Sequence, residues 1–151
     1  MSRVDVSTEV VIDRPLPVVA GFAGDPMNAP GWYRNIESVT WLTDPPVRVG
    51  SALSFVAHFL GRRLAYTYEV VDYQPGQRLV MRTAEGPFPM QTSYAWTKVG
   101  PGRTRMTLRN EGEPSGFSGV GAPLLAAAMR RANRKDLQAL QRLLEHQSPP
   151  A

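Results

Sequence analysis

The chain has 151 residues, which fits one domain, here 1–151 with an ordered core of about 2–145, and is enough to bury a substantial core. Its 42% hydrophobic and 20% charged residues exclude a wholly disordered chain, and no apolar run approaches the roughly 18 residues that cross a bilayer. It has no cysteine, which excludes disulfides and thiolate chemistry.

The net charge of +4 is spread over several predicted elements, with 17 Lys and Arg against 13 Asp and Glu. A scattered basic balance is weak evidence for a polyanionic partner, so we expect no specific nucleic acid, while a transient membrane contact stays open. The N-terminus alternates polar and apolar residues and lacks the continuous apolar core of a signal peptide, so we expect a cytoplasmic protein.

The N-terminal part of the chain predicts a strand and then one or two short helices. Val4 to Ile12 alternates polar and apolar residues, which is typical of a half-buried strand. Pro15 suits the first turn of a helix, and Val18, Val19, Phe22 and Ala23 form a short helical stripe. Turn residues then leave room for only a very short second helix, and 32–42 is predicted as the second strand.

Period-two alternation continues through five more predicted strands. They are centred on 53–59, 64–70, 79–83, 90–96 and 104–110. Short turns rich in Gly and Pro separate most of them, which indicates antiparallel neighbours.

The pattern changes to a helical period from about Phe117 to His146. Apolar residues and one aspartate recur at spacings of three and four, at Leu125, Met129, Ala132, Asp136, Leu140 and Leu144. The element order predicts an α+β protein in which a long C-terminal helix covers one face of a seven-stranded antiparallel sheet.

One face of the predicted strands collects large aromatic and sulfur-containing residues rather than Val, Leu and Ile. Several carry polar atoms that need partners when buried, and the first half of the helix is rich in alanine, so the sheet and helix can enclose a cavity. Ordinary interdigitation of small and large side chains is the alternative. The predicted ligand-binding residues are Trp32, Phe55, Phe59, Tyr66, Tyr68, Met81, Thr83, Met90, Thr92, Tyr94, Trp96, Met106, Leu125, Ala128, Met129 and Ala132.

Four stretches resemble the START/Bet v 1-like (SRPBCC) superfamily, within it the polyketide cyclase/dehydrase-like branch. They are Val10 to Pro15, Phe22 to Trp32, Tyr68 to Leu79 and Asp136 to Glu145, so the resemblance runs over most of the chain, from about Ser2 to Glu145. It implies a helix-grip fold, with a curved seven-stranded sheet wrapped around the last helix and a hydrophobic cavity between them. It implies less about activity, because the superfamily includes cyclases, lipid carriers, hormone receptors and chaperone co-activators.

The residues offer few groups for catalysis. His58 falls on the outer face of its strand and His146 near the C-terminus, so neither a metal site nor a Ser-His-Asp unit is expected, and we expect no cofactor. Hydroxyls and an amide at Tyr66, Tyr68, Tyr94, Thr83, Thr92 and Asn110 can orient a carbonyl or phenol. The weak catalytic candidates are Tyr66, Tyr68, Tyr94 and Asp72, and no general base is identifiable.

Three functions follow from these features. The first is binding or transport of a hydrophobic small molecule, lipid-like or aromatic, by a monomer or homodimer. The second is a polyketide cyclase/dehydratase-like enzyme acting on such a molecule in the same cavity. The third is a protein-interaction module that docks through Arg130, Arg131 and Arg134 on the basic face of the last helix.

Overall fold

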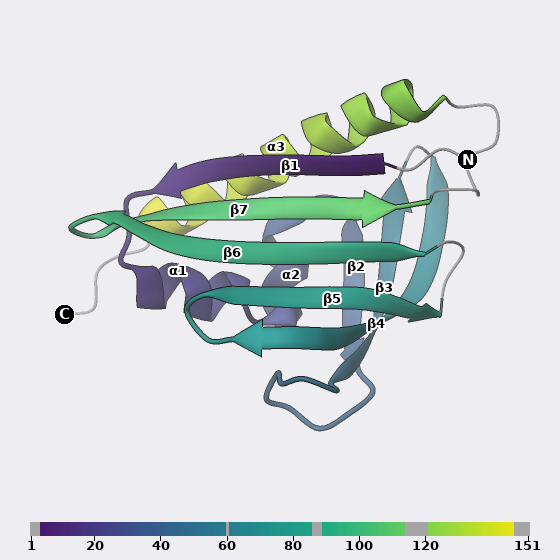
Figure 1. Cartoon of the computed structure of the whole chain (residues 1–151), viewed down its shortest axis with the longest axis horizontal. Helices are drawn as coiled ribbons and strands as arrows, with labels where there is room; N and C mark the ends of the chain where they lie inside the picture. The colour runs from purple at the N-terminus through teal and green to yellow at the C-terminus, as the bar shows by residue number, and fades with distance from the viewer. Residues whose placement is uncertain (1–3, 60, 86–88, 114–120, 147–151) are drawn as a thin grey trace.

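The structure is a computed structural model that describes residues 4–59, 61–85, 89–113 and 121–146. Its seven strands form one antiparallel sheet in the order β1-β7-β6-β5-β4-β3-β2 (Figure 1). The strands are β1 (Val4–Ile12), β2 (Ile36–Trp41), β3 (Ala52–Phe59), β4 (Arg62–Gln74), β5 (Arg78–Glu85), β6 (Met90–Gly100) and β7 (Arg103–Gly112). The helices are α1 (Leu16–Ala23), the 3-10 turn η1 (Pro26–Asn28), α2 (Ala29–Trp32) and α3 (Ala122–Glu145).

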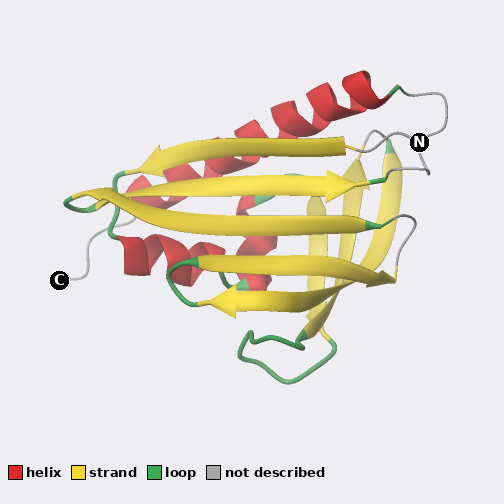
Figure 2. Ribbon diagram, in the orientation of Figure 1, coloured by secondary structure: helices red, strands yellow, loops and turns green. Residues whose placement is uncertain are grey.

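The sheet curls, so that β2 and β3 run across the direction of the other strands, and the helices lie on one face (Figures 1 and 2). The pairing register shifts between Thr67 and Tyr68 and again between Val70 and Asp72 on β4, and such irregularities bend a strand and increase its twist. The helix α3 packs along β1 and touches α2, and therefore closes the concave side of the sheet. The predicted helix-grip fold is confirmed.

Three hydrogen bonds hold α3 in place. The Gln141 side-chain amide donates to the Val11 carbonyl at 2.9 Å, and the Asp13 amide donates to the Glu145 carboxylate at 2.9 Å. The Arg34 amide donates to Oδ1 of Asp136 at 3.1 Å. The first two fasten the C-terminal half of the helix to the end of β1, and the third fastens its middle to the connection between α2 and β2.

The main core lies under the C-terminal half of α3. Leu137, Leu140 and Leu144 are fully or almost fully buried there against inward residues of the sheet and of α1 and α2. A smaller apolar cluster, formed by Val4, Val6, Leu64 and Leu125, lies near the beginning of the helix.

Two predicted boundaries were wrong. Trp32 is the last residue of α2, and the second strand starts only at Ile36. Pro30 stands in the first turn of α2, where its missing N–H costs nothing, and the Tyr33 amide closes the turn by donating to the Ala29 carbonyl at 2.8 Å. The long helix begins at Ala122 rather than near Phe117, which lies outside the described residues.

Candidate functional site

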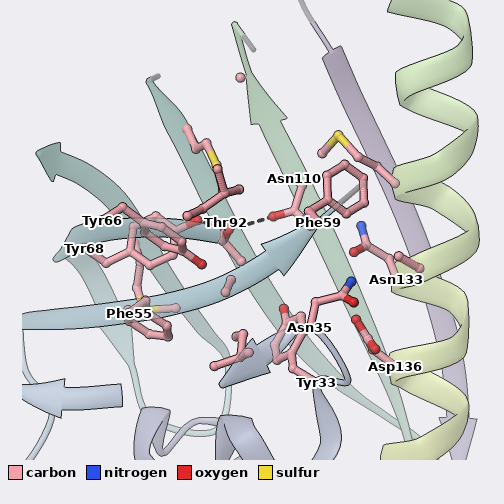
Figure 3. Close-up of a pocket in the computed structure, with 18 of the residues that line it drawn as sticks. Tyr33, Asn35, Phe55, Phe59, Tyr66, Tyr68, Thr92, Asn110, Asn133 and Asp136 are labelled. Atoms are coloured by element: carbon pink, nitrogen blue, oxygen red, sulfur yellow. Dashed lines mark hydrogen bonds between the residues drawn. The ribbon is translucent and has the colours of Figure 1, made fainter. Parts of the chain in front are cut away.

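A cavity of about 120 Å³ lies between the sheet and the first half of α3 (Figure 3). Its surface is mostly apolar, with polar groups at separate points. The lining residues are Val4, Tyr33, Asn35, Ile36, Phe55, Ala57, Phe59, Leu64, Tyr66, Tyr68, Met81, Met90, Thr92, Tyr94, Asn110, Glu111, Gly112, Leu125, Met129, Ala132, Asn133 and Asp136. Such a mixture is typical of a small-molecule site.

One wall of the cavity is aromatic. Phe55 on β3 stands opposite Tyr66 on β4, and their rings stack with centroids 5.6 Å apart. Tyr68 meets both rings edge-on, at 5.2 Å from Phe55 and 5.0 Å from Tyr66. Alternation along the two strands places these rings on the concave face, and their mutual contacts fix the rings in one arrangement.

A chain of hydrogen bonds crosses the sheet at the base of the cavity. The Tyr68 hydroxyl and Thr92 Oγ1 lie 2.6 Å apart, and Thr92 Oγ1 donates to Asn110 Oδ1 at 2.6 Å (Figure 3). Because Thr92 gives its only proton to Asn110, the Tyr68 hydroxyl donates to Thr92. This arrangement leaves the Asn110 amide nitrogen as a donor at the cavity surface.

A second set of polar side chains lines the cavity, and most of them come from α3 and from the segment after α2. Tyr94 donates to the Tyr33 hydroxyl at 3.0 Å, which leaves the proton of Tyr33 for another acceptor. Asn133 and Asp136 project from α3 toward Asn35 (Figure 3). The Asn133 amide nitrogen is buried and has no hydrogen-bond partner among the described residues. A buried donor without a partner carries an energetic cost.

Burial sets the protonation of these groups. It raises the pKa of Asp136 from 3.8 to about 6, although the Arg34 amide and the Arg34 charge act in the opposite direction. Burial also raises the pKa of each cavity tyrosine above its ordinary value: Tyr33, Tyr66, Tyr68 and Tyr94. Near neutral pH the hydroxyls are therefore neutral donors, and Asp136 is a carboxyl group that can exchange a proton.

The cavity meets an open groove of about 670 Å³ between α3, the α2–β2 connection and the end of β3. Asn35, Phe59, Ala132 and Asp136 line both spaces, so they mark the mouth. The rest of the groove is lined by Arg34, Leu124, Ala127, Ala128, Arg131 and Lys135.

The structure places most of the predicted ligand-binding residues on the cavity wall. These are Phe55, Phe59, Tyr66, Tyr68, Met81, Met90, Thr92, Tyr94, Leu125, Met129 and Ala132. Ala128 lies in the groove instead. Whether any of them binds a ligand stays a prediction.

Four predicted residues lie elsewhere. Trp32, Trp96 and Met106 belong to the main core, where Trp32 packs on Tyr33 with ring centroids 4.2 Å apart. Thr83 bonds Met90 across the β5–β6 pair, with the Met90 amide donating to its hydroxyl at 2.9 Å. A period-two pattern predicts the inward face, but it does not distinguish a cavity wall from the packed core beside it.

Of the weak catalytic candidates, Asp72 does not line the cavity. Its carboxylate is ion-paired with Arg78 and partly exposed, which removes it as a candidate acid. Tyr66, Tyr68 and Tyr94 do line the cavity. His58 is exposed beside Glu37, at 3.1 Å, as its place on the outer face predicted.

The sequence reasoning missed Tyr33, Asn35, Asn133 and Asp136 as site residues. Asp136 carried a signal, because it is the one charged residue in the apolar stripe of the helix, and Asn133 lies three residues before it. Asn133 therefore shares a helix face with Asp136. Tyr33 and Asn35 follow a helix of one turn, where no periodicity predicts the direction of a side chain.

The fold and the enclosed cavity define a START/Bet v 1-like protein of the SRPBCC superfamily. Residues 3–145 match the model of the family described as polyketide cyclase/dehydrase and lipid transport, and the chain belongs to this family. No curated protein matches the chain in a sequence comparison.

Solved structures with the same fold have low sequence identity. A START superfamily protein from Mycobacterium smegmatis is 16% identical, with a TM-score of 0.81 over 93% of this chain and 97% of that one. The ZhuI aromatase/cyclase from Streptomyces sp. R1128 is 18% identical, with a TM-score of 0.77 over 95% and 94%. A protein from Thermus thermophilus is 20% identical, with a TM-score of 0.78 over 93% and 96%. At these identities the likeness shows the fold alone.

Proposed function

We propose that the protein binds a hydrophobic small molecule, with an aromatic or lipid-like body, in the cavity beside α3. The observation that carries this proposal is the partly enclosed apolar space with three stacked or edge-on rings and with polar groups at separate points. The family, whose description includes both cyclisation and lipid transport, supports the same class of ligand. Among the described residues, no helix is long and apolar enough to cross a membrane.

The polar groups favour a ligand with oxygen atoms rather than a pure hydrocarbon. Donors remain at the Tyr33 hydroxyl and the Asn110 amide, and an apolar body that fills the cavity would leave both without an acceptor. A carbonyl or hydroxyl on the ligand restores these hydrogen bonds. Ligand selection would then rest on the positions of its oxygens.

Filling the cavity tests the binding function. We expect Ala132→Phe, which places a ring in the cavity, to weaken binding of the uncharged probe N-phenyl-1-naphthylamine by about tenfold or more, as measured by fluorescence titration. The control is Ala139→Phe on the same helix, outside the cavity lining, which should leave binding unchanged. An Ala132→Phe variant that folds and binds like the wild type, or a wild-type protein that binds no probe, would refute the proposal. Native mass spectrometry for a co-purifying apolar molecule gives an independent measurement.

Asp136 favours a second function, cyclase/dehydratase-like catalysis in the same cavity. A carboxylate with a pKa near 6 can take a proton from a carbon between two carbonyls, and neutral hydroxyls nearby can stabilise the enolate oxygen. The enolate carbon can then attack a second carbonyl of the chain, whose oxygen takes that proton from Asp136 and becomes a hydroxyl. When Asp136 next takes the remaining proton from the same carbon, it can pass this proton to the hydroxyl, which leaves as water. Asp136 would then be the general base that could not be identified from the sequence.

Catalysis predicts a specific response to Asp136→Asn. With a short poly-β-keto thioester as substrate, we expect kcat to fall by about a hundredfold while the probe still binds, because the amide keeps the shape but cannot accept the proton. In the wild type, kcat should rise with pH through about 6, since the base works when deprotonated. Activity that is equal in the variant, or absent in both proteins, leaves binding as the function.

A further inference from the structure

We infer that the groove between α3, the α2–β2 connection and the end of β3 binds the anionic group of the ligand whose apolar body occupies the cavity. The ligand class is thus an amphipathic anion, with an apolar or aromatic body and one carboxylate, sulfonate or phosphate. This inference rests on the proposed binding function and adds the charge of the ligand and its direction of entry.

The first observation is the continuity of the two spaces. Asn35, Phe59, Ala132 and Asp136 line both the cavity and the groove, so one molecule can extend through the mouth. The cavity, at about 120 Å³, is smaller than the roughly 300–1,000 Å³ of typical ligand sites, and the groove is the open space that adjoins it. A ligand of ordinary size would therefore occupy part of the groove.

The second observation is the charge of the groove. Arg34, Arg131 and Lys135 line it, and all three are exposed. No carboxylate of the described residues forms an ion pair with any of them, whereas three arginines on the sheet, Arg78, Arg103 and Arg109, pair with aspartates. The charges in the groove are therefore available for a ligand anion.

Asp136 is the one carboxylate that lines the groove, and it stands at the mouth that the groove shares with the cavity. It is 2% exposed and its Oδ1 accepts from the Arg34 amide, so it lies at the inner side of the mouth. Three cations face this single acid, and the local charge of the groove stays positive at neutral pH. The anion is expected at the outer end, between Arg131 and Lys135, one helical turn apart.

The apolar part of the groove continues that of the cavity. Leu124, Ala127 and Ala128 recur along α3 at the same three- and four-residue spacing that leads to Arg131 and Lys135. Small side chains there leave a shallow channel, and Leu124 is 70% exposed. An apolar body leaving the mouth would remain in contact with carbon atoms while its charge meets the basic residues.

Two probes that differ by one anionic group test the inference. N-phenyl-1-naphthylamine is uncharged, and 8-anilinonaphthalene-1-sulfonate is the same ring system with a sulfonate. We expect the wild type to bind the sulfonate probe more tightly than the uncharged probe. The double variant Arg131→Glu with Lys135→Glu should weaken binding of the sulfonate probe by about tenfold or more, and its affinity for the uncharged probe should stay within about twofold of the wild type. Added salt should weaken binding of the sulfonate probe only.

The same helix provides a matched control. Arg130→Glu with Arg134→Glu changes the net charge by the same amount, but neither residue lines the groove. This control should bind both probes like the wild type. If the two double variants lost affinity for the sulfonate probe equally, the inference would be refuted, because the loss would reflect net charge rather than the groove.

The outcomes separate this inference from the proposed function. Binding of the uncharged probe without any preference for the sulfonate refutes the anion site and leaves the cavity function intact. Failure of both probes to bind refutes both. If the groove variant loses only binding to vesicles of phosphatidylglycerol and phosphatidylcholine, the basic residues contact a membrane, and the inference is wrong.

Discussion

Asp136 has a structural contact on one side and the cavity on the other. Its Oδ1 accepts the Arg34 amide, which holds the connection between α2 and β2 against the helix, while its side chain also lines both the cavity and its mouth. Burial disfavours the ionised form, so the proton is held to higher pH than in an unfolded chain.

This shift predicts a pH-dependent stability with a definite sign. The folded pKa of about 6 lies above the unfolded value of 3.8, so the native state holds the proton while the unfolded state has lost it. The contribution of Asp136 to the free energy of unfolding is therefore largest below about pH 4. This contribution falls by about 2–3 kcal/mol as the pH rises from 4 to 6, and it does not recover at higher pH.

Asp136→Asn removes this loss but keeps an oxygen for the Arg34 amide. We expect the variant to melt several degrees above the wild type at pH 8 and close to it at pH 4, in thermal melts followed by circular dichroism. A variant that melts lower at pH 8 would mean that the carboxylate is stabilised in the native state, for instance by the Arg34 charge.

At the scale of elements, α3 has two halves with different surroundings. Its first half brings Leu125, Met129 and Ala132 to the cavity, whereas Leu137, Leu140 and Leu144 in the second half are buried in the main core. The bonds from Gln141 and Glu145 fasten the second half to the end of β1. The second half therefore anchors the helix, and the first half lies over the space that a ligand would fill.

In the second half of α3, shortening a buried side chain should destabilise the protein much more than shortening an exposed one. We expect Leu140→Ala to lower the free energy of unfolding by about 2–5 kcal/mol, because the residue is fully buried, in urea denaturation. Leu143→Ala, on the same helix at 39% exposure, should cost about 1 kcal/mol or less. Equal losses would contradict the anchoring role.

At the scale of the whole molecule, the curled sheet and the helix enclose a space that neither element makes alone. The turn of β2 and β3 across the other strands brings Phe59 to face residues of α3, whereas Phe55 stays on the aromatic wall beside Tyr66 and Tyr68 (Figures 1 and 3). Several arginines of the sheet, such as Arg103 and Arg109, pair with aspartates. Arg34, Arg131 and Lys135 in the groove form no ion pair with a carboxylate of the described residues.

The sequence by itself predicted the strands and the long helix, although the second strand begins later than predicted, and it predicted the inward face of every strand except that one. Alternation with period two and the three-to-four spacing of apolar residues are local consequences of backbone geometry, so they predict which side of an element is buried. They also predicted the aromatic wall at Phe55, Tyr66 and Tyr68. The cytoplasmic location and the oligomeric state stay predictions.

Only the tertiary structure decided which buried residues border empty space. Trp96 and Tyr94 alternate on the same face of β6, yet Trp96 packs in the core and Tyr94 reaches the cavity, because the helix and α1 cover different parts of the sheet. The pKa of Asp136 and the continuity of cavity and groove likewise depend on distances between elements far apart in the chain. No local period carries such distances, since they follow from how the sheet curls and where the helix is fastened.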